Sequence, residues 1–91
     1  MTVVNNNSGL GQCRPGIDTA YGDRSGNKDE LCRFSEFNFA KLAQDMGCLG
    51  IQVEQPEDIS KALKTALEAD VPAVVNVVTD IHCKAPEPWA P

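Results

Sequence analysis

Three consecutive asparagines and two glycines stand near the start of the chain, in the run Thr2-Val3-Val4-Asn5-Asn6-Asn7-Ser8-Gly9-Leu10-Gly11. Asn is depleted within strands but favoured where a strand gives way to a turn or a ligand site. Amide and main-chain carbonyl oxygens are hard donors that suit Mg²⁺ or Ca²⁺. Gly9 and Gly11 allow the close approach and the positive φ that a tight turn needs. The residue types fit either a cation site at a strand end or a plain Asx-rich turn, and composition alone favours the plain turn.

Helical and strand patterns alternate after residue 38. The helical spacing i, i+3, i+4 and i+7 predicts an amphipathic helix that begins after the N-cap Asn38, stops at Gly47 and turns Phe39, Leu42, Ala43 and Met46 toward the core. Alternating apolar residues at 49, 51 and 53 then predict a half-buried strand.

A second helix and a last strand follow. Pro56 is typical of a first helical turn, and the predicted core stripe of this helix consists of Ile59, Ala62, Leu63, Ala66 and Leu67. The run 73–79 is apolar on both faces, which is typical of an inner strand of a parallel sheet. Asn76 lies within this run and needs a hydrogen-bond partner inside the sheet.

The order of elements predicts an α/β fold: a partial doubly wound parallel sheet of about three strands and two to three helices, three-layer αβα when complete. Residues 10–33 carry no sustained period and are expected to form a loop or short helix, and long loops of this kind are usually functional or disordered. The proline-rich segment 84–91 is expected to be an extended tail that packs through Trp89. Two helices cannot cover both faces of such a sheet, so we expect further elements from elsewhere.

Composition narrows the class of protein. The formal net charge of −5 argues against a nucleic-acid binder and against anionic membrane surfaces. No apolar run is long enough for a membrane span and the amino terminus does not resemble a signal peptide, so we expect a cytoplasmic protein. The spacing of Cys13, Cys32, Cys48 and Cys83 argues against a zinc site and favours free, mostly buried thiols.

The amide cluster resembles the second half of the thiamine-diphosphate motif, which begins with Gly-Asp-Gly and ends in an Asn-Asn pair followed by a glycine-containing turn. The remainder, apart from residues 12–33, resembles the cofactor-binding C-terminal domain of acetolactate synthase-like enzymes. The matching segments are Phe39-Ala40-Lys41-Leu42-Ala43, Gly50-Ile51-Gln52-Val53-Glu54, Pro56-Glu57-Asp58, Ala62-Leu63, Ala66-Leu67 and Pro72 to Asp80. Asn76 stands where relatives often carry an acid.

The resemblance implies which residues contact the cofactor. In that family an Asn side chain and a main-chain carbonyl two residues later bind Mg²⁺, which holds the diphosphate. The pattern then places Asn6, Asn7, Gly9, Leu10 and Gly11 at the cofactor, with Asn7 and the Gly9 carbonyl as the metal ligands and Leu10 as an apolar neighbour. A rival register pairs the Asn6 side chain with the Ser8 carbonyl, but it loses the glycine at the second position of the turn.

The resemblance also implies parts that these residues do not contain. The 91 residues do not contain the Gly-Asp-Gly half of the motif, which supplies a carboxylate ligand. They also do not contain the separate domain with the glutamate that activates the cofactor. We therefore expect a fragment, residues 1–91 being the C-terminal portion of a thiamine-diphosphate-binding domain that carries no catalytic residue and is inactive alone. Its partners would be the remainder of the enzyme or another subunit, in a homodimer or homotetramer.

The implied chemistry is that of a lyase or transferase which decarboxylates or joins 2-oxo acids. Two alternatives stay open. The chain can be a non-enzymatic α/β module that binds a partner protein through its uncovered sheet face, or a truncated gene product with no function of its own.

Overall fold

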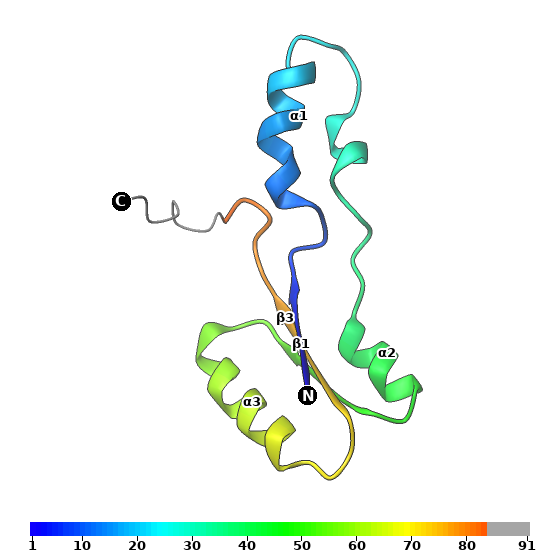
Figure 1. Cartoon of the computed structure of the whole chain (residues 1–91), viewed down its shortest axis with the longest axis vertical. Coiled ribbons are helices and arrows are strands. Elements are labelled where there is room, and N and C mark those ends of the chain that lie inside the picture. Colours follow the sequence, from blue (N-terminus) through cyan, green and yellow to red (C-terminus); the bar gives the residue numbers. More distant parts are fainter. Residues whose placement is uncertain (84–91) are drawn as a thin grey trace, which may run out of the picture. The chain divides into compact units, whose positions relative to one another are not determined.

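A computed structural model describes residues 1–83; the expected tail 84–91, with Trp89, lies outside the described residues. Its helices and strands are β1 (Thr2–Asn6), α1 (Arg14–Tyr21), α2 (Phe39–Asp45), β2 (Leu49–Val53), α3 (Ile59–Glu68) and β3 (Ala73–Val78), with short 3-10 helices at Gly11–Cys13, Lys28–Leu31 and Pro56–Asp58 (Figure 1). The chain divides into two compact units. The sheet unit contains Met1–Asn6 and Glu36–Thr79, and the loop unit contains Asn7–Ser35 and the residues from Asp80 onward.

The sheet unit is a three-stranded, all-parallel sheet in the order β1-β3-β2. In the register, Val3 pairs with Val75, and Val53 pairs with Val77. β3 therefore lies between the other two strands, as its continuous apolar run predicts. The structure confirms the α/β class and the partial doubly wound sheet.

One face of the sheet packs against α3. Ala62 and Ala66 of the helix meet the side chains of alternate strand residues, and together they form the main core of the unit. The buried members are Val53, Ala62, Ala66, Ala73 and Val75, with Leu49, Ile51, Ile59, Leu63 and Val77 packed around them.

The opposite face is approached by α2, on the other side of the strands in Figure 1. Gly50 alternates with the residues that face α3, and a Cβ atom built on Gly50 would lie 2.9 Å from the Ala40 Cα. The Gln44 side chain donates a hydrogen bond to the Gly50 carbonyl, with a distance of 2.9 Å from Nε2 to the oxygen. The helix therefore sits almost directly on the strand backbone, and this contact has room only for glycine.

Three of the predicted core residues lie at the surface instead. Met46 is 74% exposed, Leu42 is 52% exposed and Leu67 is 71% exposed. The close approach explains the two errors in α2, because only the small side chains of Ala40 and Ala43 fit between helix and sheet. The larger apolar residues are turned away, so the prediction of a core position for Met46 is wrong.

The predicted ends of α2 are confirmed. The Asn38 side chain accepts a hydrogen bond from the Lys41 N–H at 3.0 Å, which satisfies one of the free donors of the first turn. Gly47 follows the helix with φ at +82°, the left-handed conformation that ends many helices.

The segment predicted as a loop or short helix contains α1, which has eight residues and a proline in its first turn. None of the described helices is long and apolar enough to cross a membrane. All four cysteines are free thiols, but the expectation that most are buried is wrong, since only Cys32 is buried and Cys13 and Cys83 are exposed.

Candidate functional site

The end of β1 holds two of the three asparagines within the sheet unit. The Asn5 Oδ1 accepts a hydrogen bond from the Thr79 hydroxyl at 2.7 Å. Asn6 is 8% exposed, its Nδ2 donates to the Phe37 carbonyl at 2.8 Å, and its own carbonyl accepts from the Thr79 N–H at 2.9 Å. These two amides therefore tie the carboxyl end of β1 to the residues that follow β3 and precede α2.

The third asparagine begins a tight turn in the loop unit. The Asn7 Oδ1 accepts a hydrogen bond from the Gly9 N–H at 3.1 Å, which closes an Asx turn. Ser8, between them, has φ at +56°, the one non-glycine residue with positive φ among the described residues. Such a conformation costs free energy in a residue with a side chain and is found most often at functional sites.

Of the two properties predicted for Gly9 and Gly11, the structure shows the close approach but not the positive φ. Neither has a positive φ, because Ser8 provides the left-handed step of the turn. A Cβ atom on Gly9 would lie 2.6 Å from the Ile81 Cδ1, and one on Gly11 would lie 2.9 Å from the Ile81 carbonyl oxygen. Glycine is required at both positions because Gly9 packs tightly against the Cys32 carbonyl and Gly11 against the Ile81 carbonyl.

The residues after the turn pair with a distant segment of the same unit. Gly9 and Arg33 form an isolated antiparallel bridge, in which the Phe34 N–H donates to the Ser8 carbonyl and the Leu10 N–H donates to the Cys32 carbonyl. No N–H or side-chain donor of the described residues reaches the Gly9 carbonyl. The Leu10 side chain is 48% exposed, so it offers an apolar surface beside the turn.

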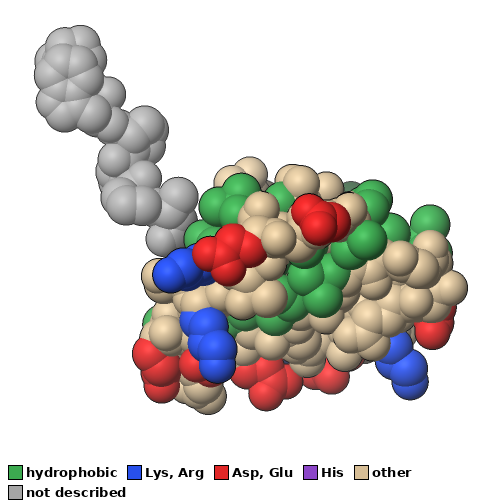
Figure 2. Space-filling view, turned by 90° about the horizontal axis from the view of Figure 1, so that it is seen from below, with side chains coloured by type: hydrophobic (Ala, Val, Ile, Leu, Met, Phe, Trp, Pro, Cys, Tyr) green, Lys and Arg blue, Asp and Glu red, His purple; other side chains and the backbone are tan. Residues whose placement is uncertain are grey.

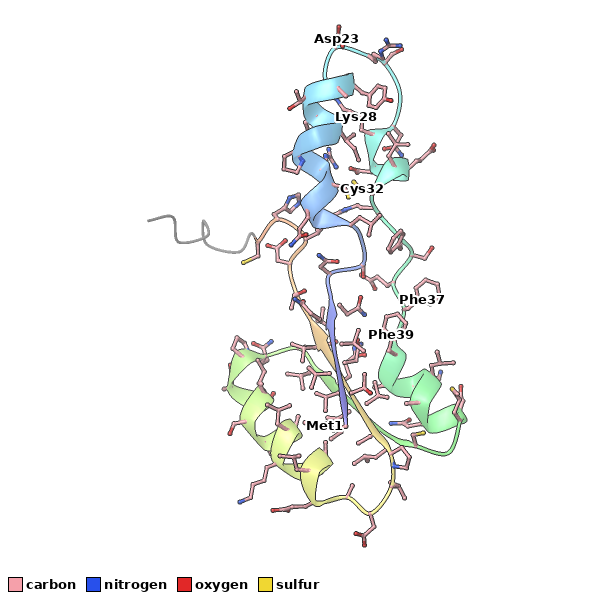
Figure 3. All side chains as sticks on the ribbon, viewed as in Figure 1. Met1, Asp23, Lys28, Cys32, Phe37 and Phe39 are labelled. Atoms are coloured by element: carbon pink, nitrogen blue, oxygen red, sulfur yellow. The ribbon has the colours of Figure 1, made fainter. Side chains whose placement is uncertain are left out.

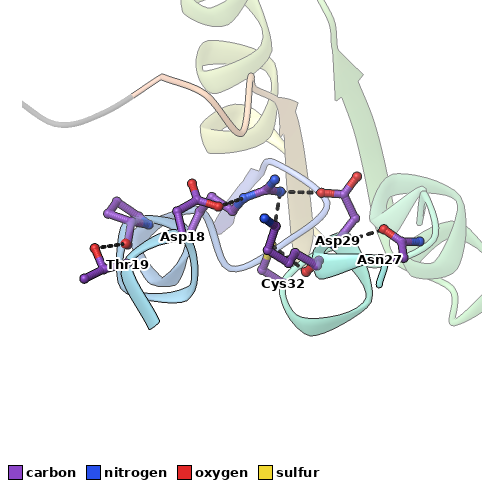
Figure 4. Close-up of polar contacts among 8 residues, drawn as sticks. Asp18, Thr19, Asn27, Asp29 and Cys32 are labelled. Atoms are coloured by element: carbon purple, nitrogen blue, oxygen red, sulfur yellow. Dashed lines mark hydrogen bonds and ion pairs between the residues drawn. The ribbon is translucent and has the colours of Figure 1, made fainter. Parts of the chain in front are cut away.

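Arg14 holds the loop unit together (Figure 4). Its Nε donates to Asp18 at 3.0 Å and its Nη1 to the Asp29 carboxylate, with the buried Cys32 Sγ 3.8 Å from Nη1. The hydrogen bond from Arg14 lowers the pKa of Asp29, and the same bond is the main cause that raises the pKa of Arg14. Sequence reasoning missed this cluster, since nothing in the local pattern joins residues 14 and 29.

Asn76 is fully buried in the middle of the sheet, and its predicted need for a partner is met only in part. Its Nδ2 donates to the Gln52 Oε1 at 3.3 Å, and Gln52 in turn donates to Glu54 at 3.0 Å. The Asn76 Oδ1 is buried and accepts no hydrogen bond from the described residues.

A family assignment has to account for three features of this chain: the parallel sheet, the amides at the end of β1 and the strained turn. A family model described as the C-terminal TPP binding domain of thiamine pyrophosphate enzymes matches residues 1–77. The chain belongs to this family. Thiamine pyrophosphate, also called thiamine diphosphate, is therefore the cofactor of the enzyme of which this domain is a part. Searches of curated proteins and of solved structures return no significant match.

The turn of this TPP-binding domain carries two oxygen donors of one chemical type. Its oxygens are a neutral amide at Asn7 and a main-chain carbonyl at Gly9, both of the hard type that Mg²⁺ accepts. Within residues 1–83, no three His, Cys, Asp or Glu side chains come together as a metal site. The assignment of Asn6, Asn7, Gly9, Leu10 and Gly11 to cofactor binding stays a prediction.

Proposed function

We propose that this domain provides one half of the magnesium-diphosphate anchor in a thiamine-diphosphate-dependent enzyme that resembles acetolactate synthase and acts on 2-oxo acids. The domain supplies no catalytic residue and is inactive alone. The observation that carries the proposal is the strained turn Asn7-Ser8-Gly9 at the carboxyl end of a parallel strand. In open α/β sheets, ligands bind beyond the carboxyl ends of the strands.

The geometry of the turn supports Asn7 and Gly9 as the metal ligands. The positive φ of Ser8 reverses the chain so that the Asn7 amide and the Gly9 backbone are joined by a hydrogen bond. The Gly9 N–H uses one lone pair of the Asn7 Oδ1, so the second remains for a cation. The Gly9 carbonyl accepts no hydrogen bond within residues 1–83, so both of its lone pairs remain for one.

The hydrogen bonds disfavour the rival register. The Asn6 side chain is buried within the sheet unit, where its Nδ2 donates to the Phe37 carbonyl and fixes the orientation of the amide. The Ser8 carbonyl, its partner in that register, accepts from the Phe34 N–H and keeps one lone pair, whereas the Gly9 carbonyl keeps both. We therefore assign Asn6 a positioning role, in which it fixes the end of β1 from which the turn departs.

Each residue of the turn has a distinct part in holding the cofactor. Asn7 and Gly9 would bind the metal, Leu10 would offer its exposed apolar side chain to the cofactor, and Gly11 would let the chain turn closely past Ile81. When bound, thiamine diphosphate stabilises the carbanion that forms when a bond beside a carbonyl is made or broken. The protein contributes binding and orientation rather than the reaction itself.

The test uses the enzyme that carries this domain together with an upstream Gly-Asp-Gly half. Asn7→Ala removes one metal ligand, and we expect the apparent Mg²⁺ affinity, measured by titration of cofactor fluorescence quenching, to fall by roughly 10- to 100-fold. Asn5→Ala is the matched control, because Asn5 is an adjacent amide that bonds to Thr79 rather than to the turn. We expect its Mg²⁺ affinity to change by less than about 3-fold.

Three outcomes would count against the proposal. A larger loss of Mg²⁺ affinity in Asn6→Ala than in Asn7→Ala, with both proteins folded, would favour the rival register. An enzyme whose activity does not depend on thiamine diphosphate and Mg²⁺ would overturn the proposal itself. Activity of the 91-residue chain alone toward 2-oxo acids would refute its assignment as an inactive part.

A further inference from the structure

The side chain of Ile81 packs onto both glycines of the turn. A Cβ atom built on Gly9 would lie 2.6 Å from the Ile81 Cδ1, and one built on Gly11 would lie 3.3 Å from the Ile81 Cγ1. The Ile81 side chain therefore occupies space that side chains at positions 9 and 11 would otherwise fill. Isoleucine is branched at Cβ, which restricts its χ1 angle and makes it a stiff support.

The backbone of Cys32 also meets the turn at Gly9. The Cys32 carbonyl lies against the position of a Cβ atom on Gly9, and it accepts a hydrogen bond from the Leu10 N–H at 2.7 Å. Cys32 lies on the segment that runs alongside α1 in Figure 3. Gly9 is therefore in close contact with one backbone group and with the Ile81 side chain, and it has little room to move while both stay in place.

Ile81 is itself held by a closed turn. The Asp80 Oδ1 accepts a hydrogen bond from the His82 N–H at 2.9 Å, which forms a second Asx turn in the loop unit. The Asp80 carbonyl accepts another from the Cys83 N–H at 3.0 Å. Both hydrogen bonds span Ile81, so the backbone that carries its side chain is fixed on either side.

The type of donor at the turn does not distinguish Mg²⁺ from Ca²⁺. The Asn7 amide and the Gly9 carbonyl are neutral, hard oxygens that both ions accept. Mg²⁺ requires nearly ideal octahedral geometry at roughly 2.0–2.1 Å, whereas Ca²⁺ accepts about six to eight oxygens at roughly 2.3–2.6 Å in a flexible arrangement. Selectivity between the two ions therefore depends on how rigidly the turn holds its oxygens.

We propose that Ile81 is a positioning residue that makes this site selective for Mg²⁺ over Ca²⁺, because it keeps the Gly9 carbonyl from shifting away from the Asn7 amide. The inference rests on the proposed function and adds the choice of ion. The loop unit offers little other apolar support, since Cys32 is its one buried hydrophobic residue among those described. Neighbouring packing would therefore not compensate for loss of the Ile81 side chain.

The test compares the two ions in the enzyme that carries this domain together with an upstream Gly-Asp-Gly half. Calorimetric titrations with MgCl₂ and with CaCl₂, in the presence of thiamine diphosphate, measure the two dissociation constants. Ile81→Ala should weaken Mg²⁺ binding roughly 10-fold and Ca²⁺ binding less than about 3-fold, because only Mg²⁺ needs the exact spacing. Ile81→Val loses the Cδ1 atom against Gly9 but keeps the branched Cβ, so it should shift the ratio in the same direction by less.

Leu31→Ala is the matched control. Hydrophobic side chains reach the surface at several places on this chain, as the face shown in Figure 2 illustrates. Leu31 is one of the exposed residues, with 56% of its surface accessible, and it belongs to the loop unit. Its truncation removes an aliphatic side chain from the same unit, so the ratio of Mg²⁺ to Ca²⁺ affinity should stay within about 2-fold of the unchanged enzyme.

A second measurement needs no metal. In the 91-residue chain, Ile81→Ala should speed amide hydrogen exchange at Gly9 and Leu10 several-fold, while exchange in β3 stays unchanged. Equal losses of Mg²⁺ and Ca²⁺ affinity, unchanged exchange at Gly9, or the same change of ratio in Leu31→Ala would each overturn the role of Ile81 and leave the metal role of Asn7 standing. If Asn7→Ala left the affinity for both ions unchanged, the proposed function would fail, and the role of Ile81 with it.

Discussion

The sheet unit and the loop unit are stabilised in different ways. All the buried hydrophobic residues of the described chain except Cys32 belong to the sheet unit, where α3 and the strands form one core. The loop unit relies on Arg14 with its two carboxylates, on an Asx turn and on a single antiparallel bridge. Apolar packing makes unfolding cooperative, whereas a few exposed polar contacts allow local opening at little cost.

This contrast is informative about function. The turn proposed to bind the metal lies in the weakly stabilised unit, and the strand that leads into it lies in the packed one. Segments that bind ligands are commonly drawn from the parts of a protein with low local stability. The two regions should therefore respond differently to the same kind of substitution.

The largest difference is expected between two glycine substitutions. Gly50→Ala places a methyl group against the backbone of Ala40, where neither the strand nor α2 can yield easily. We expect a loss of about 3 kcal/mol or more in the free energy of unfolding, a large share of the ~5–15 kcal/mol typical of a domain. Urea titration followed by circular dichroism measures this loss.

The matched control is Gly16→Ala in α1 of the loop unit. A Cβ atom there meets nothing within 4 Å. Alanine favours a helix over glycine by roughly 0.5–1 kcal/mol, so α1 should become slightly more helical while the urea midpoint of the sheet unit stays unchanged. If Gly50→Ala proved as harmless as Gly16→Ala, the close contact between α2 and β2 would be wrong.

Asn76 provides the next largest effect. Asn76→Asp would bury a carboxyl group next to the Gln52 side chain, and burial raises its pKa. A rise of two pKa units corresponds to a loss of about 2.7 kcal/mol at neutral pH. Because the unfolded carboxyl ionises more easily, this loss is absent below its unfolded pKa of about 3.9 and grows as the pH rises toward the folded pKa.

Asn76→Val distinguishes the effect of a buried charge on stability from the effect of losing the hydrogen bond to Gln52. It removes the buried Oδ1 that has no donor in the described residues, and it leaves behind only the Gln52 oxygen on an exposed side chain. We expect a change within about 1 kcal/mol, at all pH values. Urea titrations between pH 4 and pH 8 distinguish the two variants, and equal stability curves would contradict the buried position of the side chain.

Much of the sheet unit could be predicted from the sequence, because its signals are local. The alternating apolar residues predicted β2, and the continuous apolar run predicted β3 and its central position. Asn38 and Gly47 predicted the ends of α2. The packing of α2 could not be predicted, because its close approach at Gly50 depends on a contact between residues far apart in the chain. Periodicity locates an apolar face but does not say how much of that face meets the sheet.

The candidate site was predictable only as a list of residues. The asparagines could be located because amides cluster at strand ends and because they match a motif. The positive φ of Ser8 and the joining of residues 9 and 33 depend on long-range pairing that no local pattern records. The contact between Arg14 and Asp29 could not be predicted for the same reason, because it joins residues far apart in the chain.

Two helix caps, one in each unit, allow a matched comparison in which the expected loss of stability is intermediate. The Asn38 side chain caps α2 in the sheet unit at 3.0 Å, and the Asn27 side chain caps the 3-10 helix Lys28–Leu31 in the loop unit at 3.1 Å. Asn38→Ala should lower the free energy of cooperative unfolding by about 1 kcal/mol. Asn27→Ala should leave it unchanged and instead speed amide hydrogen exchange in residues 28–33. A similar loss of cooperative stability in both variants would show that the loop unit unfolds together with the sheet.

The smallest expected effect is the response of the loop unit to acid. The hydrogen bond from Arg14 lowers the pKa of Asp29 in the folded chain, so the pair contributes local stability above the ordinary carboxyl pKa of about 3.9. That contribution is lost as the pH falls through the lowered pKa, because the protonated carboxyl no longer attracts the guanidinium. Hydrogen exchange of residues 14–33 should therefore depart from its intrinsic pH dependence only below about pH 4, and Asp29→Asn should show the acid level of protection at neutral pH. Asp23→Asn is the control, since Asp23 is an exposed acid of the same unit with no contact to Arg14. If the two variants exchanged alike, the Arg14–Asp29 pair would not be what orders this unit.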